Sequence, residues 1–342
     1  MNTVRPELVA VAAALGTLDG LTSRAVETLA SGDQRDGSSY VSQPHLVIGA
    51  KVAVATGRPL LLSGPPGSGK SSFASFIARN MGTSYYEYTC TDESRSADLM
   101  YSFDAVRRLG DAQIGRLAAD ESDRLQYSRY LTPGPLWWSF DSASAEHRGL
   151  DPEELLAAGI PRAVNPAVPL PSGPDNRIDD DGSVLLIDEI DKADSSFSNG
   201  LLGPLGSRRF EVPLLGAQVR ASSEWAPFVL ITSNHDRDLP EALLRRCVVV
   251  EVRPHTVEQL VEIAHAHLPP DILDEEVRAA IGALAQQVTL DEGIAAVSAA
   301  EFVDLVRVVV AMGGASLDSA DFQMILRLFT EKAIGRRKGR SS

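Results

Sequence analysis

The feature that most constrains the fold of this chain is the stretch GPPGSGKSS at residues 64–72, which follows the short apolar run PLLLS. Gly64, Gly69, Lys70 and Ser71 have the spacing G-x-x-x-x-G-K-[ST]. Glycines let the backbone curl so that successive N–H groups point at phosphate oxygens, and a helix that starts near Lys70 adds its positive end. The stretch therefore predicts a buried strand, a phosphate-binding loop and a helix, in that order.

This loop is expected to hold the phosphates of a nucleotide. The ammonium of Lys70 can reach the β- and γ-phosphates, and the hydroxyl of Ser71 can ligate Mg²⁺. The residues assigned to nucleotide binding are Gly64, Pro65, Pro66, Gly67, Ser68, Gly69, Lys70, Ser71 and Ser72.

Other apolar runs predict the rest of the sheet. The five expected strands are PLLLS (59–63), YYEYTC (85–90), VLLID (184–188), PFVLITSN (227–234) and CVVVEV (247–252). Continuous apolar strands that alternate with helices are typical of a parallel sheet buried on both faces. After Pro254 the spacing becomes helical throughout. We therefore predict an α/β fold, a parallel sheet sandwiched by helices, followed by an all-helical domain.

Polar side chains at the strand ends predict the chemistry. Asp188 ends VLLID, where a carboxylate suits a Mg²⁺ partner through water, and Glu189 can polarise a water for attack on the γ-phosphate. Asn234 can hold that water or a γ-phosphate oxygen, although an Asn after a strand is often a turn former. Of the pair Arg245 and Arg246, we expect Arg246 to serve a neighbouring subunit in trans, whereas a helix end also favours arginine through its dipole.

Taken together, these sites resemble the AAA+ ATPases, and GRPLLLSGPPGSGKS, VLLIDEIDKAD and LPEALLRRC are similar to blocks of the MoxR group. The resemblance implies ATP and Mg²⁺ as ligands, a ring of identical subunits, expected to be a hexamer, and a protein client or von Willebrand A-domain partner. It also implies a helical insertion within about 95–130, a hairpin over 208–222 (RRFEVPLLGAQVRAS) and a helical lid. Many such lids place an arginine where this chain has Ala299 and Ala300.

The expected organisation follows from these blocks. It comprises an N-terminal helical extension and linker (1–37), the ATPase domain (38–253), the lid (254–335) and a basic tail (336–342). The Pro-, Gly- and Asp-rich stretch 141–182 is too long for an ordinary loop and is either functional or mobile. For the adjacent Trp137 and Trp138, we expect one ring in the core and one under the insertion, or a contact with a partner.

Composition limits the partners. A net charge of −14 argues against nucleic acid, no apolar stretch approaches the ~20 residues that span a bilayer, and two lone cysteines fit a cytoplasmic protein. The main hypothesis is a ring ATPase that remodels or activates a protein partner. One alternative is a nucleic-acid-linked motor or antiphage-defence ATPase that uses the tail and Arg208, Arg209 and Arg220. Another is a nucleotide-gated scaffold without turnover.

Overall fold

The structure is a computed structural model. It describes residues 36–114, 122–171, 182–221, 227–273, 275–290 and 297–311, together with Met324. Residues 1–35 of the predicted N-terminal extension, most of the predicted lid beyond residue 311 and the basic tail (336–342) lie outside the described residues. In the described part, no helix is long and apolar enough to cross a membrane.

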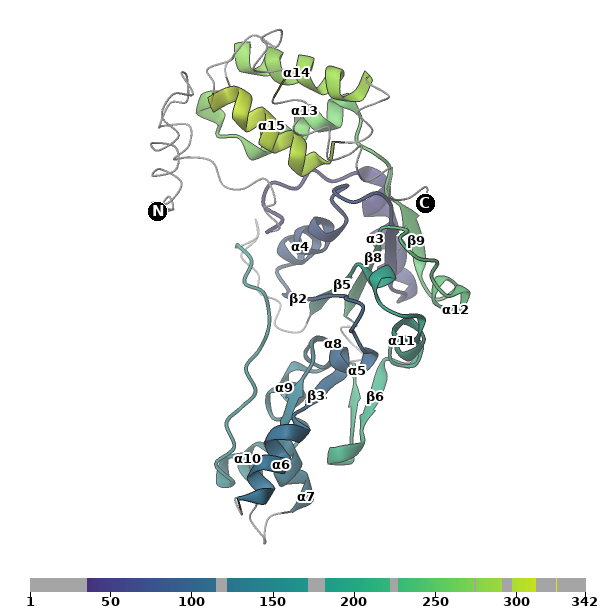
Figure 1. The fold of residues 1–342 in the computed structure, drawn as a ribbon, viewed down its shortest axis with the longest axis vertical. Helices are drawn as coiled ribbons and strands as arrows, with labels where there is room; N and C mark the ends of the chain where they lie inside the picture. Colours follow the sequence, from purple (N-terminus) through teal and green to yellow (C-terminus); the bar gives the residue numbers. More distant parts are fainter. Residues whose placement is uncertain are drawn as a thin grey trace.

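A five-stranded parallel sheet forms the centre of the molecule (Figure 1). Its strands, in their order across the sheet, are β2 (Ser84–Thr89), β5 (Ser183–Asp188), β8 (Phe228–Ser233), β1 (Leu60–Ser63) and β9 (Val248–Glu251). Every residue of β1, β5 and β8 is buried. The five runs predicted as strands therefore form one sheet, and the predicted α/β fold class is confirmed.

The register of the sheet aligns the ends of its central strands. Ser63 pairs with Ser233, and Ile187 pairs with Ile231. Because the strands are parallel, the residues that follow β1, β5 and β8 all emerge at the same edge. The phosphate-binding loop, the acidic pair and Asn234 are therefore brought to one edge by the pairing alone.

Helices cover both faces of the sheet. α3 (Pro44–Thr56) and α4 (Lys70–Met81) pack on one face, with Leu60 and Leu62 beneath them. Leu61 points to the opposite face, as the two-residue period of a strand requires, and joins a larger core with α11 (Ser195–Ser207) and the short α12 (Glu241–Leu244).

A long segment between β2 and β5 extends from the sheet, at the bottom of Figure 1. Its elements are α5 (Ser96–Met100), β3 (Tyr101–Phe103), α6 (Ala105–Gln113), α7 (Asp123–Ser128), β4 (Leu131–Pro133), α8 (Pro135–Phe140), α9 (Ser142–Glu146) and α10 (Pro152–Ala157). β3 and β4 pair as an antiparallel sheet. The insertion expected to be helical over about 95–130 therefore includes a strand whose partner lies just beyond it.

The Pro-rich stretch 141–182 contains regular structure in its first part. Asp141 accepts a hydrogen bond from the backbone N–H of Ser144 at the start of α9, and Asp151 caps α10 in the same way. Further along, the backbone N–H of Val168 donates to the carbonyl of Tyr85 in β2. These contacts fix residues 141–171, so that this part is not a simple loop.

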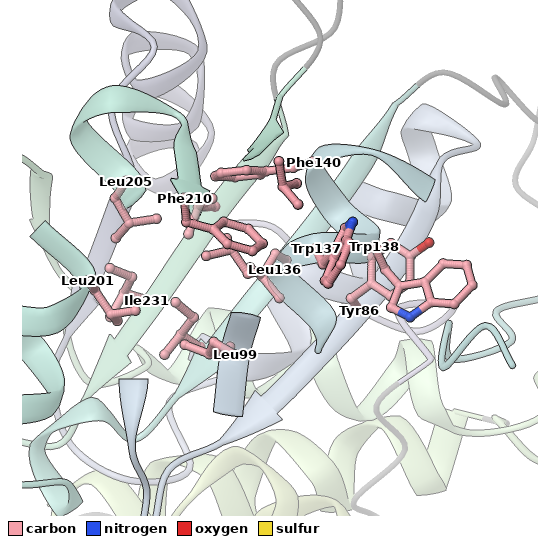
Figure 2. Packing of buried hydrophobic residues seen from close by; sticks show 14 of the residues in the cluster. Tyr86, Leu99, Leu136, Trp137, Trp138, Phe140, Leu201, Leu205, Phe210 and Ile231 are labelled. Carbon is pink, nitrogen blue, oxygen red and sulfur yellow. The ribbon is translucent and has the colours of Figure 1, made fainter. Parts of the chain in front are cut away.

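Trp137 and Trp138 are both buried in the larger core (Figure 2). The ring of Trp137 packs edge-on against Phe210, and its Nε1–H donates to Ser144 Oγ at 3.2 Å. Because the two residues sit on α8, about 100° apart around the helix, their rings reach different parts of one core. The alternative of a partner contact is not needed to bury either ring.

The hairpin predicted over 208–222 is present. β6 (Arg209–Val212) and β7 (Ala217–Arg220) are antiparallel, but a 3₁₀ turn, Pro213–Leu215, and Gly216 connect them. The connection is therefore longer than the Leu-Gly turn that the sequence suggests.

Three helices form a separate apolar cluster at the opposite end of the molecule from the insertion, at the top of Figure 1. They are α13 (Val257–His267), α14 (Glu275–Leu290) and α15 (Ala299–Ala311). The nucleotide-binding edge of the sheet faces this helical cluster. The domain boundaries themselves stay a prediction.

Candidate active site

The side chain of Lys70 folds back over the backbone of the loop that follows β1. The Lys70 Nζ donates to the carbonyls of Gly64 and Pro65, at 2.9 and 2.8 Å, and the side chain is almost fully buried. Burial lowers the pKa of Lys70 to about 8, an effect that the charge of Asp188 opposes. Phosphate oxygens in the loop would favour the charged ammonium further, because an opposite charge raises the pKa of a lysine.

Gly67 is required at the tip of the loop. Its φ is 75°, and a Cβ there would lie 2.1 Å from Ser298 Cβ at the start of α15. The backbone N–H of Ala299 also donates to the carbonyl of Gly67 at 3.2 Å. The helical cluster therefore touches the phosphate loop directly, through backbone atoms on both sides.

Asp188 and Ser71 meet at the edge of the sheet. The Ser71 hydroxyl donates to Asp188 Oδ1 at 2.7 Å, and the Thr232 hydroxyl donates to the same oxygen at 2.5 Å. Thr232 also accepts a hydrogen bond from the backbone N–H of Glu189 at 2.8 Å. This threonine ties the end of β5 to β8, and it was not among the predicted site residues.

The donors around Ser71 and Asp188 suit Mg²⁺. A hydroxyl and a carboxylate are the hard oxygen ligands that this ion prefers, and it commonly takes one or two protein ligands together with phosphate oxygens and water. In the described residues, no group of three or more His, Cys, Asp or Glu side chains could hold a metal alone. A metal at this position would therefore depend on the phosphates of the nucleotide for further ligands.

Glu189 adopts an unusual backbone conformation. Its φ is 55° and its ψ is 47°, the left-handed region that non-glycine residues rarely occupy. The carboxylate accepts a hydrogen bond from Asn234 Nδ2 at 3.1 Å and contacts the ammonium of Lys192. Strained residues of this kind cluster at active sites. The conformation therefore supports a functional role for Glu189 beside Asn234, as the sequence predicts.

Asp191 holds the loop that carries Asn234. Its Oδ2 accepts hydrogen bonds from the backbone N–H groups of Asn234 and Asp236, at 3.0 and 2.8 Å, and the residue is 1% exposed. The sequence analysis did not select Asp191, although it is the third acid of the DEID sequence. It acts as a positioning residue, because its contacts fix the backbone of Asn234.

Replacing Asp191 with alanine should weaken both the fold and the reaction. One buried and one partly buried N–H group would lose their acceptor, which we expect to lower the free energy of unfolding by about 1–3 kcal/mol. Denaturant unfolding and ATPase assays would measure both effects. Asp194→Ala is the matched control, since Asp194 makes only an exposed 3.6 Å ion pair with Arg237. Equal effects of the two substitutions would contradict the positioning role.

The loop and the strand ends line one cavity of about 260 Å³. From the phosphate side it is lined by Pro66, Gly67, Gly69, Lys70, Ser71, Ser72, Asp188, Glu189 and Asn234. Gly64, Pro65 and Ser68 support the loop from behind instead, since the Ser68 hydroxyl donates to the carbonyl of Pro65 at 2.8 Å. The structure thus brings together most of the predicted nucleotide-site residues.

The sequence analysis missed other residues that line this cavity. Its lining includes Tyr40, Val41, His255, Ile263 and His267. These residues come from the segment before α3, from the segment before α13 and from α13 itself, so no local motif links them to the phosphate loop. The Tyr40 ring packs against the rings of two phenylalanines of α4, which places it firmly beside the loop.

From the helical cluster, Ala299, Ala300 and Val303 line the cavity, and none of the described residues that line it is an arginine. Arg307 lies further along α15, where it is buried and sits 3.5 Å from Asp304.

Arg245 and Arg246 lie elsewhere. Both are exposed after α12, where Arg245 pairs with Glu241 and Arg246 Nη1 donates to the carbonyl of Ala242 at 3.0 Å. With Arg58 and Arg208 they line a second cavity of about 460 Å³. The structure therefore does not bring these two arginines to the nucleotide cavity of their own chain.

A parallel sheet with a phosphate loop after one strand, an Asp–Glu pair after a second and a buried Asn after a third defines a P-loop nucleoside triphosphatase. Residues 59–247 match the AAA domain (dynein-related subfamily), which is more than half of the chain. The chain therefore belongs to this family and is an ATP hydrolase. AAA proteins bind ATP, typically with Mg²⁺, and generally form oligomeric rings. A search of curated proteins finds no match.

Solved structures with a similar fold include an ATPase from Cytophaga hutchinsonii, with 14% identity, a TM-score of 0.40, and coverage of 68% of this chain and 52% of that one. The Thermotoga maritima RuvB Holliday junction branch migration motor has 16% identity, a TM-score of 0.42, and coverage of 80% and 65%. This chain spans less than two thirds of either protein's length. At this level of similarity, they say nothing about what this chain acts on.

Proposed function

We propose that the chain is a MoxR-like ATPase that works as a ring and remodels or activates a protein partner. The observation that carries the ring is the position of Arg245 and Arg246. Leu60, at the start of β1, pairs with Val248, at the start of β9. The two arginines precede Val248, whereas the phosphate loop follows the other end of β1. They therefore lie at the opposite edge of the sheet from their own nucleotide site.

The cavity around these arginines suits an anion. Arg58, Arg208, Arg245 and Arg246 contribute four guanidinium groups, and no carboxylate of the described residues lines the cavity. Arg208 Nη2 donates to the carbonyl of Gly57 at 3.0 Å, which fixes one of these groups. An anionic group presented by a neighbouring subunit, such as the terminal phosphate of its nucleotide, would be attracted here. Head-to-tail contacts that close in this way form rings, and we propose a hexamer.

Each site residue has a proposed role in hydrolysis. Lys70 neutralises phosphate charge, and Ser71 and Asp188 would hold Mg²⁺, which supplies further charge stabilisation when bound. Glu189 accepts a proton from the attacking water, which Asn234 orients. A bond from the water oxygen to the γ-phosphorus forms, the bond to the β–γ bridging oxygen breaks, and ADP leaves. Arg246 of a neighbour stabilises the charge that develops on the transferred group.

Mixed subunits test the shared site. Arg246→Ala chains and Lys70→Ala chains should each have little ATPase activity alone. After mixing, an interface between an intact Lys70 and an intact Arg246 should recover part of the wild-type rate. The measurement is the ATPase rate of mixtures at several ratios and constant total concentration.

The control pairs two Arg246→Ala preparations, which contain no intact interface and should stay inactive at every ratio. If the mixture of the two variants stays equally inactive, while native mass measurements show that the chains co-assemble, then the trans role of Arg246 is wrong.

The resemblance to the MoxR group suggests a partner with a von Willebrand A-type metal-binding domain. Purified proteins of this kind, encoded beside the gene, should bind the ring more tightly with ATP than with ADP. A salt-dependent DNA gel shift in the absence of such binding would instead favour the nucleic-acid motor. The negative net charge and the engagement of Arg208 with Gly57 favour the protein partner.

A further inference from the structure

The turn after β5 places the side chain of Lys192 beside the carboxylate of Glu189. Ile190–Lys192 is a 3₁₀ turn, and the backbone N–H of Lys192 donates to the carbonyl of Glu189 at 3.0 Å. Because a 3₁₀ helix has three residues per turn, side chains three positions apart lie over one another. The ammonium of Lys192 therefore reaches Oε2 of Glu189, to which it donates a hydrogen bond.

The backbone of Lys192 is held from a second direction. Arg237 Nη1 donates to the carbonyl of Lys192 at 3.1 Å and lies 3.6 Å from Asp194 Oδ1. Arg237 belongs to the loop after β8, the same loop that begins with Asn234. The two loops that carry the lysine and the amide are therefore tied together, which fixes the point from which the lysine side chain extends.

Each oxygen of the Glu189 carboxylate has a donor of its own. Oε1 accepts from Asn234 Nδ2 at 3.1 Å, and Oε2 accepts from Lys192. The last torsion of a glutamate side chain has a broad energy minimum, so one hydrogen bond would leave the carboxylate free to rotate. Donors on both oxygens define the plane of the carboxylate as well as its position.

Lys192 does not itself face the nucleotide. Glu189 and Asn234 line the cavity, whereas Lys192 is not among the described residues that do. Its side chain is 47% exposed, and in the described part of the chain its ammonium forms an ion pair with no other carboxylate. An effect of Lys192 on the reaction would therefore pass through Glu189.

We propose that Lys192 is a positioning residue for hydrolysis, which holds Oε2 of Glu189 while Asn234 holds Oε1. This inference rests on the proposed role of Glu189 as the base. A carboxylate oxygen has two lone pairs, so an oxygen that accepts one hydrogen bond can still receive a proton from the attacking water. Without Lys192 the carboxylate would be held at one oxygen only, and a displacement of about 1 Å in a reacting group can cost about 100-fold in rate.

Substitutions of Lys192 should separate catalysis from binding. Lys192→Met should lower kcat about ten- to 100-fold and leave the Kd for AMP-PNP within about twofold, because the carboxylate is misplaced while the cavity is intact. Lys192→Arg keeps a charged donor and should retain at least about a third of the wild-type kcat. Lys51→Met, at an exposed lysine of α3, is the matched control and should change neither value. Denaturant unfolding of Lys192→Met should resemble that of the wild type, since such an exposed ion pair contributes little stability.

A double-mutant cycle shows whether Lys192 acts through Glu189. In the Glu189→Gln background, Lys192→Met should lower the single-turnover rate by less than about twofold, because no carboxylate remains to be oriented. The inference is overturned if Lys192→Met leaves kcat unchanged or raises it, or if the fold loss is the same in both backgrounds. Normal turnover by Glu189→Gln is a different result, which would contradict the role of Glu189 as the base.

Discussion

Replacing Lys70 with alanine should abolish measurable nucleotide binding. The buried ammonium lies within hydrogen-bond distance of two carbonyls of the phosphate loop, and among the described residues that line the cavity Lys70 is the one lysine or arginine. Charge-assisted hydrogen bonds contribute about 1.5–3 kcal/mol each, so the loss of those that Lys70 is expected to donate to the β- and γ-phosphates should weaken ATP binding by about 100-fold or more. Fluorescent nucleotide titration of the purified variant would measure this.

Two further variants make the result interpretable. Lys70→Met keeps the length of the side chain without its charge, so it should bind as poorly as Lys70→Ala if charge is the cause. Lys51→Ala, which removes an exposed lysine of α3, should bind ATP as the wild type does. Tight ATP binding by both Lys70 variants would show that the phosphates bind elsewhere.

Glu189→Gln should bind ATP normally but hydrolyse it very slowly. Glutamine has the same shape and keeps an oxygen for Asn234 Nδ2, but it cannot take a proton from water. Loss of a general base costs about 10²–10⁴ in rate, so we expect kcat to fall by that factor while the Kd for ATP stays within about twofold. Single-turnover hydrolysis and nucleotide titration would separate the two effects.

The same variant reports on assembly. With Mg-ATP, Glu189→Gln should be trapped in the ATP-bound state, and native mass measurements should show about six subunits if the proposed ring forms. Unchanged turnover would mean that another group polarises the water. A monomer under all conditions, with normal wild-type hydrolysis, would mean that the site is complete in one chain.

The sheet could be predicted from the sequence because its strands are long apolar runs. Two of these runs, Val184 to Ile187 and Phe228 to Ile231, are wholly buried. Their continuous apolar composition therefore indicates central strands. The three-residue strands β3 and β4 are different. Three residues are too few to show a period, and their pairing depends on a return of the chain about 30 residues later. Such pairs emerge only from tertiary contacts.

The candidate site likewise has residues that the sequence could predict and residues that it could not. Lys70, Ser71 and Asp188 follow apolar strands in recognisable motifs, so their meeting could be predicted. His255 and Gln43 are 212 positions apart and meet only because the segment before α3 lies beside the start of α13. Nothing local in either segment indicates a nucleotide. The left-handed backbone of Glu189 is likewise imposed by the contacts of its neighbours rather than by its residue type.

The pairing of β1 with β9 links two different sites in one mechanical unit. At one end of this strand pair, Ser63 leads into the loop that holds a subunit's own phosphates, and at the other end Arg246 leads into β9. In the proposed ring, any shift of β1 when its nucleotide is cleaved would be carried along the ladder of backbone hydrogen bonds to Arg246, which we propose serves the adjacent subunit. The order in which the subunits hydrolyse ATP would then depend on this rigid pair of strands, and no flexible segment would be needed between the two sites.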